Sequence, residues 1–148
     1  MLDMYVVLNI HGDGYSNVKG GWLLLEAGDQ ETIKAKYAAV WSQLAERFID
    51  YDHHLIFESM NEIGAKIAEM SDGEKKTAAV SAAYENINDY NQIFVDTVRS
   101  SSGNNDRRWL LIPGFNTDIN YTAGDYGFKI PENTGLNTRK LHRKGPVV

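Results

Sequence analysis

The chain of 148 residues contains no cysteine, only three prolines and no long apolar run. Without cysteine, disulfides and thiolate chemistry are excluded. No segment approaches the roughly 18 consecutive apolar residues of a membrane-spanning helix, so we expect no membrane partner. The first residues, MLDMYVVLNIH, have no basic stretch before their apolar run and no small-residue cleavage site, so we expect no signal peptide in this chain. The remaining composition, 43% hydrophobic and 24% charged, is ordinary for one globular domain.

Basic side chains are concentrated at one end of the chain, although the net charge is −5. Four of the 15 lysines and arginines lie in the last ten residues, which leaves 11 basic against 20 acidic side chains, or about −9, for the rest. An acidic body disfavours binding to a phosphate backbone, so we expect no nucleic-acid partner. The segment 137–148, NTRKLHRKGPVV, follows neither a helical nor a strand period, and we interpret it as a basic tail that is disordered or not native to the domain.

Apolar runs and amphipathic segments alternate along the chain. Near-continuous apolar runs predict buried parallel strands at Met4–Ile10, His54–Phe57 and Arg108–Ile112. Apolar residues at steps of three and four predict helices over Gln30–Ile49 and Lys75–Ser101. The order strand, helix, strand, helix, strand is typical of right-handed βαβ units, which places the chain in the α/β class.

Polar residues follow each predicted strand. His11 and Asp13 follow the first strand, Asn61 and Glu62 follow the second, and Asn116 follows the third. In parallel α/β folds, functional residues gather at the carboxyl ends of strands. These five residues are therefore the first candidates for a site.

Two glutamates belong to the second strand and its end. If the strand stays extended, Glu58 and Glu62 point to the same face and lie about 13 Å apart, at roughly 3.3 Å per residue. That separation exceeds the roughly 5–9.5 Å between the paired carboxyls of glycosidases. We therefore interpret Glu58 as a structural carboxylate that is hydrogen-bonded inside the sheet. Spacing alone leaves Glu62 as either a catalytic acid or an exposed loop acid.

Three segments resemble glycoside hydrolase family 5, the endo-β-1,4-glucanases or cellulases. They are MYVVLNIHGDGY, YDHHLIFESMNEIG and RWLLIPGFNTDINYTAGDYGFKIP, and the resemblance runs from about Met4 to Pro131. It implies an incomplete (β/α)8 TIM barrel over residues 1–136, comprising strands three to five of the family barrel. It also implies hydrolysis of β-1,4-glucans, such as cellulose or mixed-linkage β-glucan, by retaining acid/base chemistry without a cofactor, and secretion of the parent enzyme.

The resemblance also assigns roles to residues. Glu62 matches the general acid/base, Asn61 matches the asparagine that hydrogen-bonds the sugar 2-hydroxyl, and His11 matches a histidine that lines the site. Gly12 stands where the family usually has a second histidine, which we expect to weaken or reshape the site. The family's nucleophile glutamate has no match in this sequence. Activity would then require another carboxylate, such as Asp13 or Asp118, or one from a second copy of the chain, and Asp13 is the more attractive candidate because it follows a neighbouring strand end. The alternative is a weak or inactive partial barrel.

Other candidate residues keep two interpretations each. Trp22 and Tyr15 could stack on sugar rings or simply pack within their loop. Asn116 could face the substrate or serve ordinary turn chemistry. His53 and His54 lack the spacing of a helical zinc motif, so we expect no metal site.

The predicted sheet leaves two open edges. Unpaired strand edges favour pairing with another chain, so we expect a homo-oligomer that forms through these edges.

Overall fold

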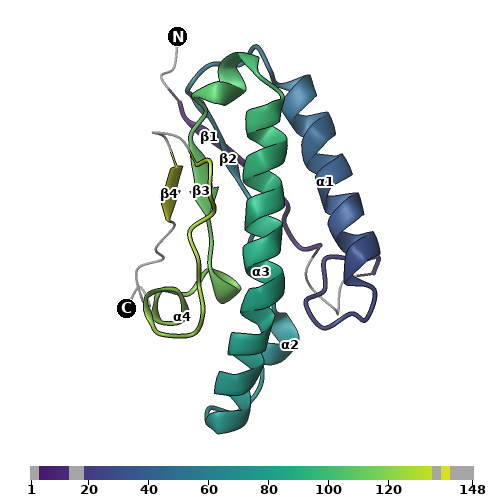
Figure 1. The fold of residues 1–148 in the computed structure, drawn as a ribbon, viewed down its shortest axis with the longest axis vertical. Coiled ribbons are helices and arrows are strands. Elements are labelled where there is room, and N and C mark those ends of the chain that lie inside the picture. The colour runs from purple at the N-terminus through teal and green to yellow at the C-terminus, as the bar shows by residue number, and fades with distance from the viewer. Residues whose placement is uncertain (1–3, 14–18, 135–137, 141–148) are drawn as a thin grey trace.

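The computed structural model describes residues 4–13, 19–134 and 138–140. Within them, a parallel sheet has the strand order β1-β2-β3-β4 (Figure 1). The strands are β1 (Val6–Asn9), β2 (Leu55–Glu58), β3 (Leu110–Ile112) and β4 (Thr138–Lys140). The α/β class and the order of the first three strands are thus as the sequence predicts.

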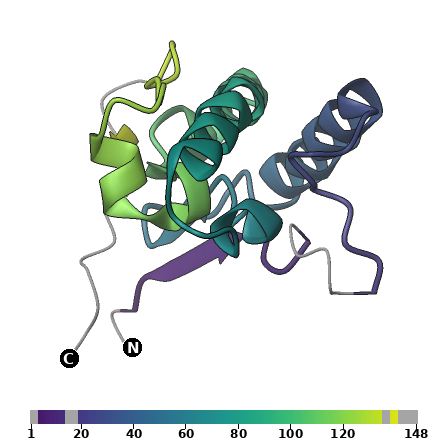
Figure 2. The same cartoon turned by 90° about the horizontal axis from the view of Figure 1, so that it is seen from below.

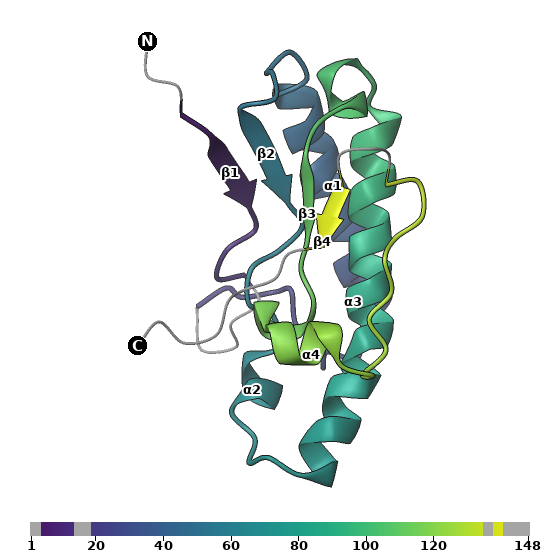
Figure 3. The ribbon, with the colours of Figure 1, turned by 90° about the vertical axis from the view of Figure 1, so that its left-hand side faces the viewer.

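Two long helices connect the first three strands. They are α1 (Gln30–Arg47), between β1 and β2, and α3 (Glu74–Ser100), between β2 and β3. Figure 3 shows the strands in front of both helices, and the view from below in Figure 2 agrees that α1 and α3 cover the same face of the sheet. The shorter elements are α2 (Ala65–Ala68), the 3-10 turns η1 (Gly103–Asp106) and η2 (Phe115–Thr117), and α4 (Ile119–Ala123).

Local sequence explains where α1 begins and which side it buries. The Asp29 side chain accepts a hydrogen bond from the backbone N–H of Thr32 at 3.1 Å, which satisfies a donor that the first helical turn leaves open. Tyr37 and Trp41 lie four residues apart and are completely buried. The helix therefore packs its aromatic stripe into the core and leaves its charged side in solvent.

Aromatic side chains from three elements meet in the centre of the core. The ring centroid of Trp41 on α1 lies 4.5 Å from that of Phe94 on α3 and 5.4 Å from that of Phe57 on β2. All three side chains are fully buried. Their burial fixes both helices against the sheet, because large aromatic side chains contribute much of the apolar area that a core removes from water.

Strand β1 differs from the prediction of a buried strand. Val6 and Val7 are 54% and 48% exposed, and the preceding Met4 and Tyr5 are exposed as well. Within the described residues, β1 pairs with β2 and no strand lies on its other side. A parallel strand is buried only where other elements cover it, and β1 lies at the edge of the described sheet.

The basic segment 137–148 also differs in part from its prediction. Thr138–Lys140 form β4, which pairs in parallel with Leu110–Ile112 of β3. Disorder therefore does not describe these three residues, and the alternative, a segment that is not native to the domain, stays a prediction. Backbone pairing with the edge of β3 supplies an order that the side-chain period of this segment does not reveal. The rest of the segment lies outside the described residues.

Candidate active site

The carboxyl ends of β1, β2 and β3 lie together at one end of the sheet. The register aligns Asn9 with Glu58 and Glu58 with Leu111. In Figure 3 these strands point toward the end of the molecule where α2 and α4 lie. The backbone N–H of Asn61 donates to the carbonyl of Ile10 at 3.0 Å, which ties the turn after β2 to the end of β1.

Glu58 is a buried carboxylate at this end of the sheet. It is 6% exposed, and Asn9 Nδ2 donates to its Oε2 at 2.5 Å across the β1–β2 pair. Burial raises the pKa of Glu58, while the Asn9 hydrogen bond and the charge of nearby His11 act in the opposite direction. The interpretation of Glu58 as a carboxylate hydrogen-bonded inside the sheet is confirmed.

Glu62 does not continue the line of β2. The strand ends at Glu58, and Glu62 has a φ of 47°, in the left-handed region. The extended geometry, on which the separation of about 13 Å between the two glutamates depends, is therefore not present. The side chains of Met60 and Ile63 are 1% exposed, whereas Asn61 and Glu62 are only partly buried. Two core anchors thus hold a turn that presents Asn61 and Glu62 at its partly solvated side.

The turn after β3 holds the turn after β2. The backbone N–H of Glu62 donates to Thr117 Oγ1 at 3.1 Å, and the backbone N–H of Asn116 donates to the carbonyl of Ile63 at 3.2 Å. Asn116 and Thr117 both have a φ of 51°. Each left-handed non-glycine residue costs about 1–3 kcal/mol, and such residues cluster at active sites, where the surrounding structure enforces them.

The loop after β1 carries a second group of candidate residues. Trp22 Nε1 donates to Asp13 Oδ1 at 2.7 Å, and the Nζ of Lys36 lies 4.1 Å from the Trp22 ring centroid. His11 is exposed, and it lines a small pocket of about 130 Å³ together with Asp13 and Lys19. The Asp13 carboxylate is therefore engaged by the indole, and Lys36 covers one side of the Trp22 ring. Tyr15 lies outside the described residues.

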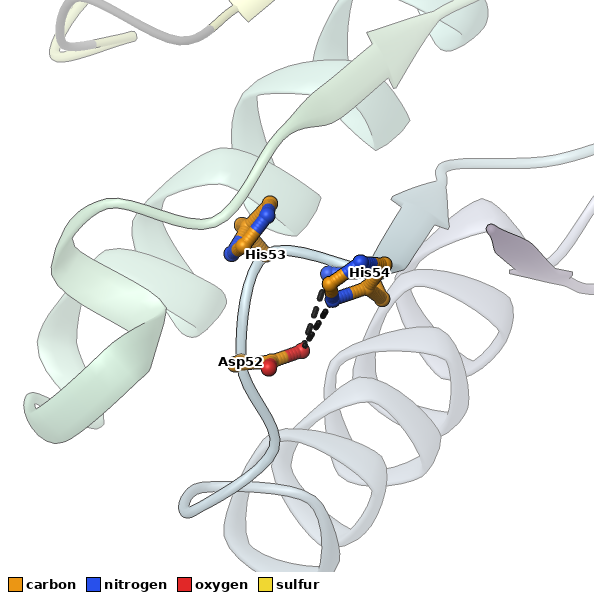
Figure 4. Close-up of side chains that lie close together, drawn as sticks. All are labelled: Asp52, His53 and His54. Carbon is orange, nitrogen blue, oxygen red and sulfur yellow. Dashed lines mark hydrogen bonds and ion pairs between the residues drawn. The ribbon is translucent and has the colours of Figure 1, made fainter. Parts of the chain in front are cut away.

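A cluster of three potential metal ligands lies at the other end of β2. Asp52, His53 and His54 each offer a ligand atom within 4.8 Å of the others, and they are the described residues that could hold a metal ion (Figure 4). Asp52 Oδ1 lies 3.0 Å from both the backbone nitrogen and the ring Nδ1 of His54. These hydrogen bonds lower the pKa of Asp52. The contacts form an Asx turn that leads the chain into β2.

Sequence reasoning missed the contribution of Thr117. It stands in PGFNTD, where Gly, Asn and Asp indicate only a turn. Its 6% exposure and its contact with Glu62 depend on residues that are 55 positions apart. No local pattern in the sequence carries that information.

The model of the cellulase family, glycosyl hydrolase family 5, matches residues 1–142 of this chain. The chain belongs to glycosyl hydrolase family 5. Endoglucanase A of Paenibacillus barcinonensis is 51% identical over 128 residues, which are 86% of this chain and 30% of that protein. The family match extends into the basic segment, whose first six residues, 137–142, fall within it.

Solved family 5 structures show the same arrangement. A family 5 xyloglucanase from Paenibacillus pabuli, in complex with ligand, superposes with a TM-score of 0.77 at 53% identity, over 87% of this chain and 34% of that one. A family 5 lichenase from Caldicellulosiruptor sp. F32, in complex with cellotetraose, also gives 0.77, at 34% identity over 97% and 38%. The chain thus spans about a third of these family 5 structures. Its sheet and helices superpose on part of their barrel, as the resemblance in the sequence predicts.

Proposed function

We propose that this chain carries the acid/base half of a retaining β-glucan hydrolase, with Glu62 as the proton-transfer group. In the first step the Glu62 carboxyl would protonate the leaving glycosidic oxygen, and in the second its carboxylate would take a proton from water. The Asn61 amide would hydrogen-bond the sugar 2-hydroxyl, a bond that strengthens as positive charge develops on the ring. The observation that supports these roles most directly is the strained, doubly hydrogen-bonded turn that presents Asn61 and Glu62 at the carboxyl edge of a family 5 sheet.

The proposed substrate is a β-1,4-glucan or a mixed-linkage β-glucan. The lichenase that resembles this chain was solved with cellotetraose, and another similar structure is a xyloglucanase. We assign the walls of the binding site to His11, Asp13, Trp22 and Asn116, together with Tyr15. Because a polymeric glucan is degraded outside the cell, we also propose that the parent enzyme is secreted.

A retaining mechanism needs a second carboxylate about 5–5.5 Å from the first. The family supplies this nucleophile from a strand that has no match in these 148 residues. Asp13 is a poor substitute, since its carboxylate already accepts the indole N–H of Trp22 at 2.7 Å. We therefore propose that full turnover needs a carboxylate other than that of Asp13.

The alternative function is a partial barrel that assembles without turning over substrate. The exposed apolar residues Val6 and Val7 of β1, and Met4 and Tyr5 just before it, favour this alternative, because an apolar strand edge pairs readily with another strand. We propose a second copy of this chain as the occupant of that edge. Light scattering should show a dimer that Val7→Lys dissociates, and a monomeric wild type over the micromolar range would contradict the proposal.

The test of the catalytic assignment compares Glu62→Gln with Glu46→Gln, which removes an exposed carboxyl from α1. Sugar release from soluble mixed-linkage β-glucan should fall at least about a hundredfold in the Glu62 variant, the usual contribution of general acid/base catalysis. The Glu46 variant should match the wild type.

If neither the wild type nor the two variants release sugar, NMR can test the site by measuring the binding of cellotetraose. Shift changes at Asn61 and Glu62 would support the site, and their absence would contradict it. Equal sugar release by wild type and Glu62→Gln would refute the assignment directly.

A further inference from the structure

Two hydrogen bonds join the turn that carries Glu62 to the turn after β3. They run from Glu62 N to Thr117 Oγ1 at 3.1 Å and from Asn116 N to Ile63 O at 3.2 Å. We call these four residues the turn clamp. The second bond is between backbone atoms and can form with many residues at these positions. The first requires a side-chain acceptor at position 117.

Backbone strain lies on both sides of the Thr117 hydrogen bond. Glu62 has a φ of 47° and Thr117 a φ of 51°. Left-handed backbone places Cβ too close to a carbonyl oxygen, and a β-branched residue such as threonine is an outlier there. Glycine, which has no Cβ, would relieve this strain. Position 117 nevertheless holds threonine, whose hydroxyl oxygen accepts a hydrogen bond from the backbone N–H of Glu62.

Thr117 is fixed from the opposite side as well. It is 6% exposed and neighbours Phe115 in η2, whose side chain is fully buried. The backbone N–H of Phe115 donates to the hydroxyl oxygen of Tyr84 on α3 at 3.1 Å, and that hydroxyl in turn donates to the carbonyl of Tyr121 at 2.8 Å. The acceptor on Thr117 is therefore attached to the long helix and the core.

The geometry points to Thr117 as a positioning residue, whose hydroxyl holds the backbone of Glu62 in the left-handed conformation and thereby sets the direction of its carboxyl. The catalytic meaning of this role rests on the proposed function of Glu62. The structural part of the inference does not, because the hydrogen bond and the conformation of Glu62 can be measured in a chain without activity. Thr117 touches no reacting group in this role and acts through Glu62.

The test uses Thr117→Val and Thr117→Ser in the whole chain. Valine keeps the β-branch and the volume but removes the acceptor, whereas serine keeps the acceptor. Exchange of the Glu62 amide hydrogen, measured by NMR, should be about tenfold faster in the valine variant than in wild type, as expected for the loss of one hydrogen bond of ordinary strength. The serine variant should stay near wild type. A general loss of stability would instead accelerate exchange at core amides such as that of Phe57.

The second readout is the backbone conformation of Glu62, followed by NMR through its amide–Hα coupling and backbone chemical shifts. The left-handed φ should be lost in the valine variant and restored in the serine variant, while a merely structural role would lower stability and leave the conformation of Glu62 in place. The wild type alone also provides a test if the valine variant does not fold, because an unprotected Glu62 amide would overturn the inference. If the clamp behaves as expected but Glu62→Gln hydrolyses glucan normally, the proposed function fails and the clamp stands.

Discussion

Arg108 is a buried cation that holds the amino-terminal end of the sheet, where β2 and β3 begin. Its side chain is 1% exposed and its guanidinium makes five hydrogen bonds. Nε donates to Asn105 Oδ1 at 2.6 Å, and Nη1 donates to the carbonyl of Leu55 at 2.8 Å and to that of Asp52 at 3.3 Å. Nη2 donates to the carbonyls of Phe48 and Tyr51, both at 2.8 Å. The guanidinium thus joins the end of α1, the start of β2 and the turn before β3.

Replacement of Arg108 by methionine keeps the aliphatic stem and removes every donor. The acceptors on Leu55 and Asn105 lie in buried hydrogen bonds, and each such acceptor left without a donor costs about 1–3 kcal/mol. The other three bonds are only partly buried, so water can replace them. Burial lowers the pKa of Arg108, a sign that the charge is desolvated, and losing that charge offsets part of the cost. We expect a net loss of about 3–4 kcal/mol, a large part of the roughly 5–15 kcal/mol that stabilises a domain.

Urea unfolding, followed by far-ultraviolet circular dichroism, measures this loss as a lower midpoint at unchanged slope. Arg108→Lys should recover about half of the free energy, because an ammonium is compact and lacks the planar fork of arginine. Arg47→Met is the matched control, since Arg47 is an exposed residue of the last turn of α1, and its change should stay within about 1 kcal/mol. Equal midpoints for the two methionine variants would refute the reasoning.

Two further predictions concern Gly64 and Glu58, which lie near the carboxyl ends of the strands. In urea unfolding, Gly64→Ala should destabilise the chain about 1–3 kcal/mol more than Gly20→Ala, which is the usual cost of overpacking. Both glycines have a positive φ, 104° and 90°, so the backbone strain of the two variants is similar. Of the two, only a Cβ at position 64 would lie 2.4 Å from the Phe115 side chain. Equal losses would contradict this account of Gly64. For Glu58, the folded-state pKa is raised above its ordinary value of 4.5, so the folded chain binds this proton more tightly and stability should fall as the pH rises above that value. Glu58→Gln should remove this fall, and parallel pH profiles of wild type and variant would show that Glu58 does not cause it.

Sequence patterns were sufficient for the elements that local physical rules control. The apolar stripe of α1 depends on residues within a turn or two of each other, and it predicts a helix from Gln30 onward. The order of strands and helices predicts the parallel sheet for the same reason. The exposure of Val6 and Val7 was not predictable in this way, because burial of a strand depends on what covers it.

Long-range contacts explain what the sequence did not reveal. Arg108 begins an apolar run and reads as the first residue of a strand, yet β3 begins only at Leu110, and the arginine reaches carbonyls more than 50 residues away. The hydrogen bond between Glu62 and Thr117 spans 55 residues and joins two turns that follow different strands. Polar contacts of this kind leave no period in the sequence, so resemblance to a family could name Glu62 but not the means by which it is held.

The turn that carries Glu62 is specified by residues within this chain. Met60 and Ile63 anchor it in the core, and Asn116 and Thr117 hold it from the neighbouring strand end. None of these contacts requires the nucleophile of a complete retaining site. This turn can therefore form without a second carboxylate, and packing and hydrogen bonds within the chain maintain its left-handed backbone. A second carboxylate, brought within about 5–5.5 Å of Glu62, would then meet a group that is already in place.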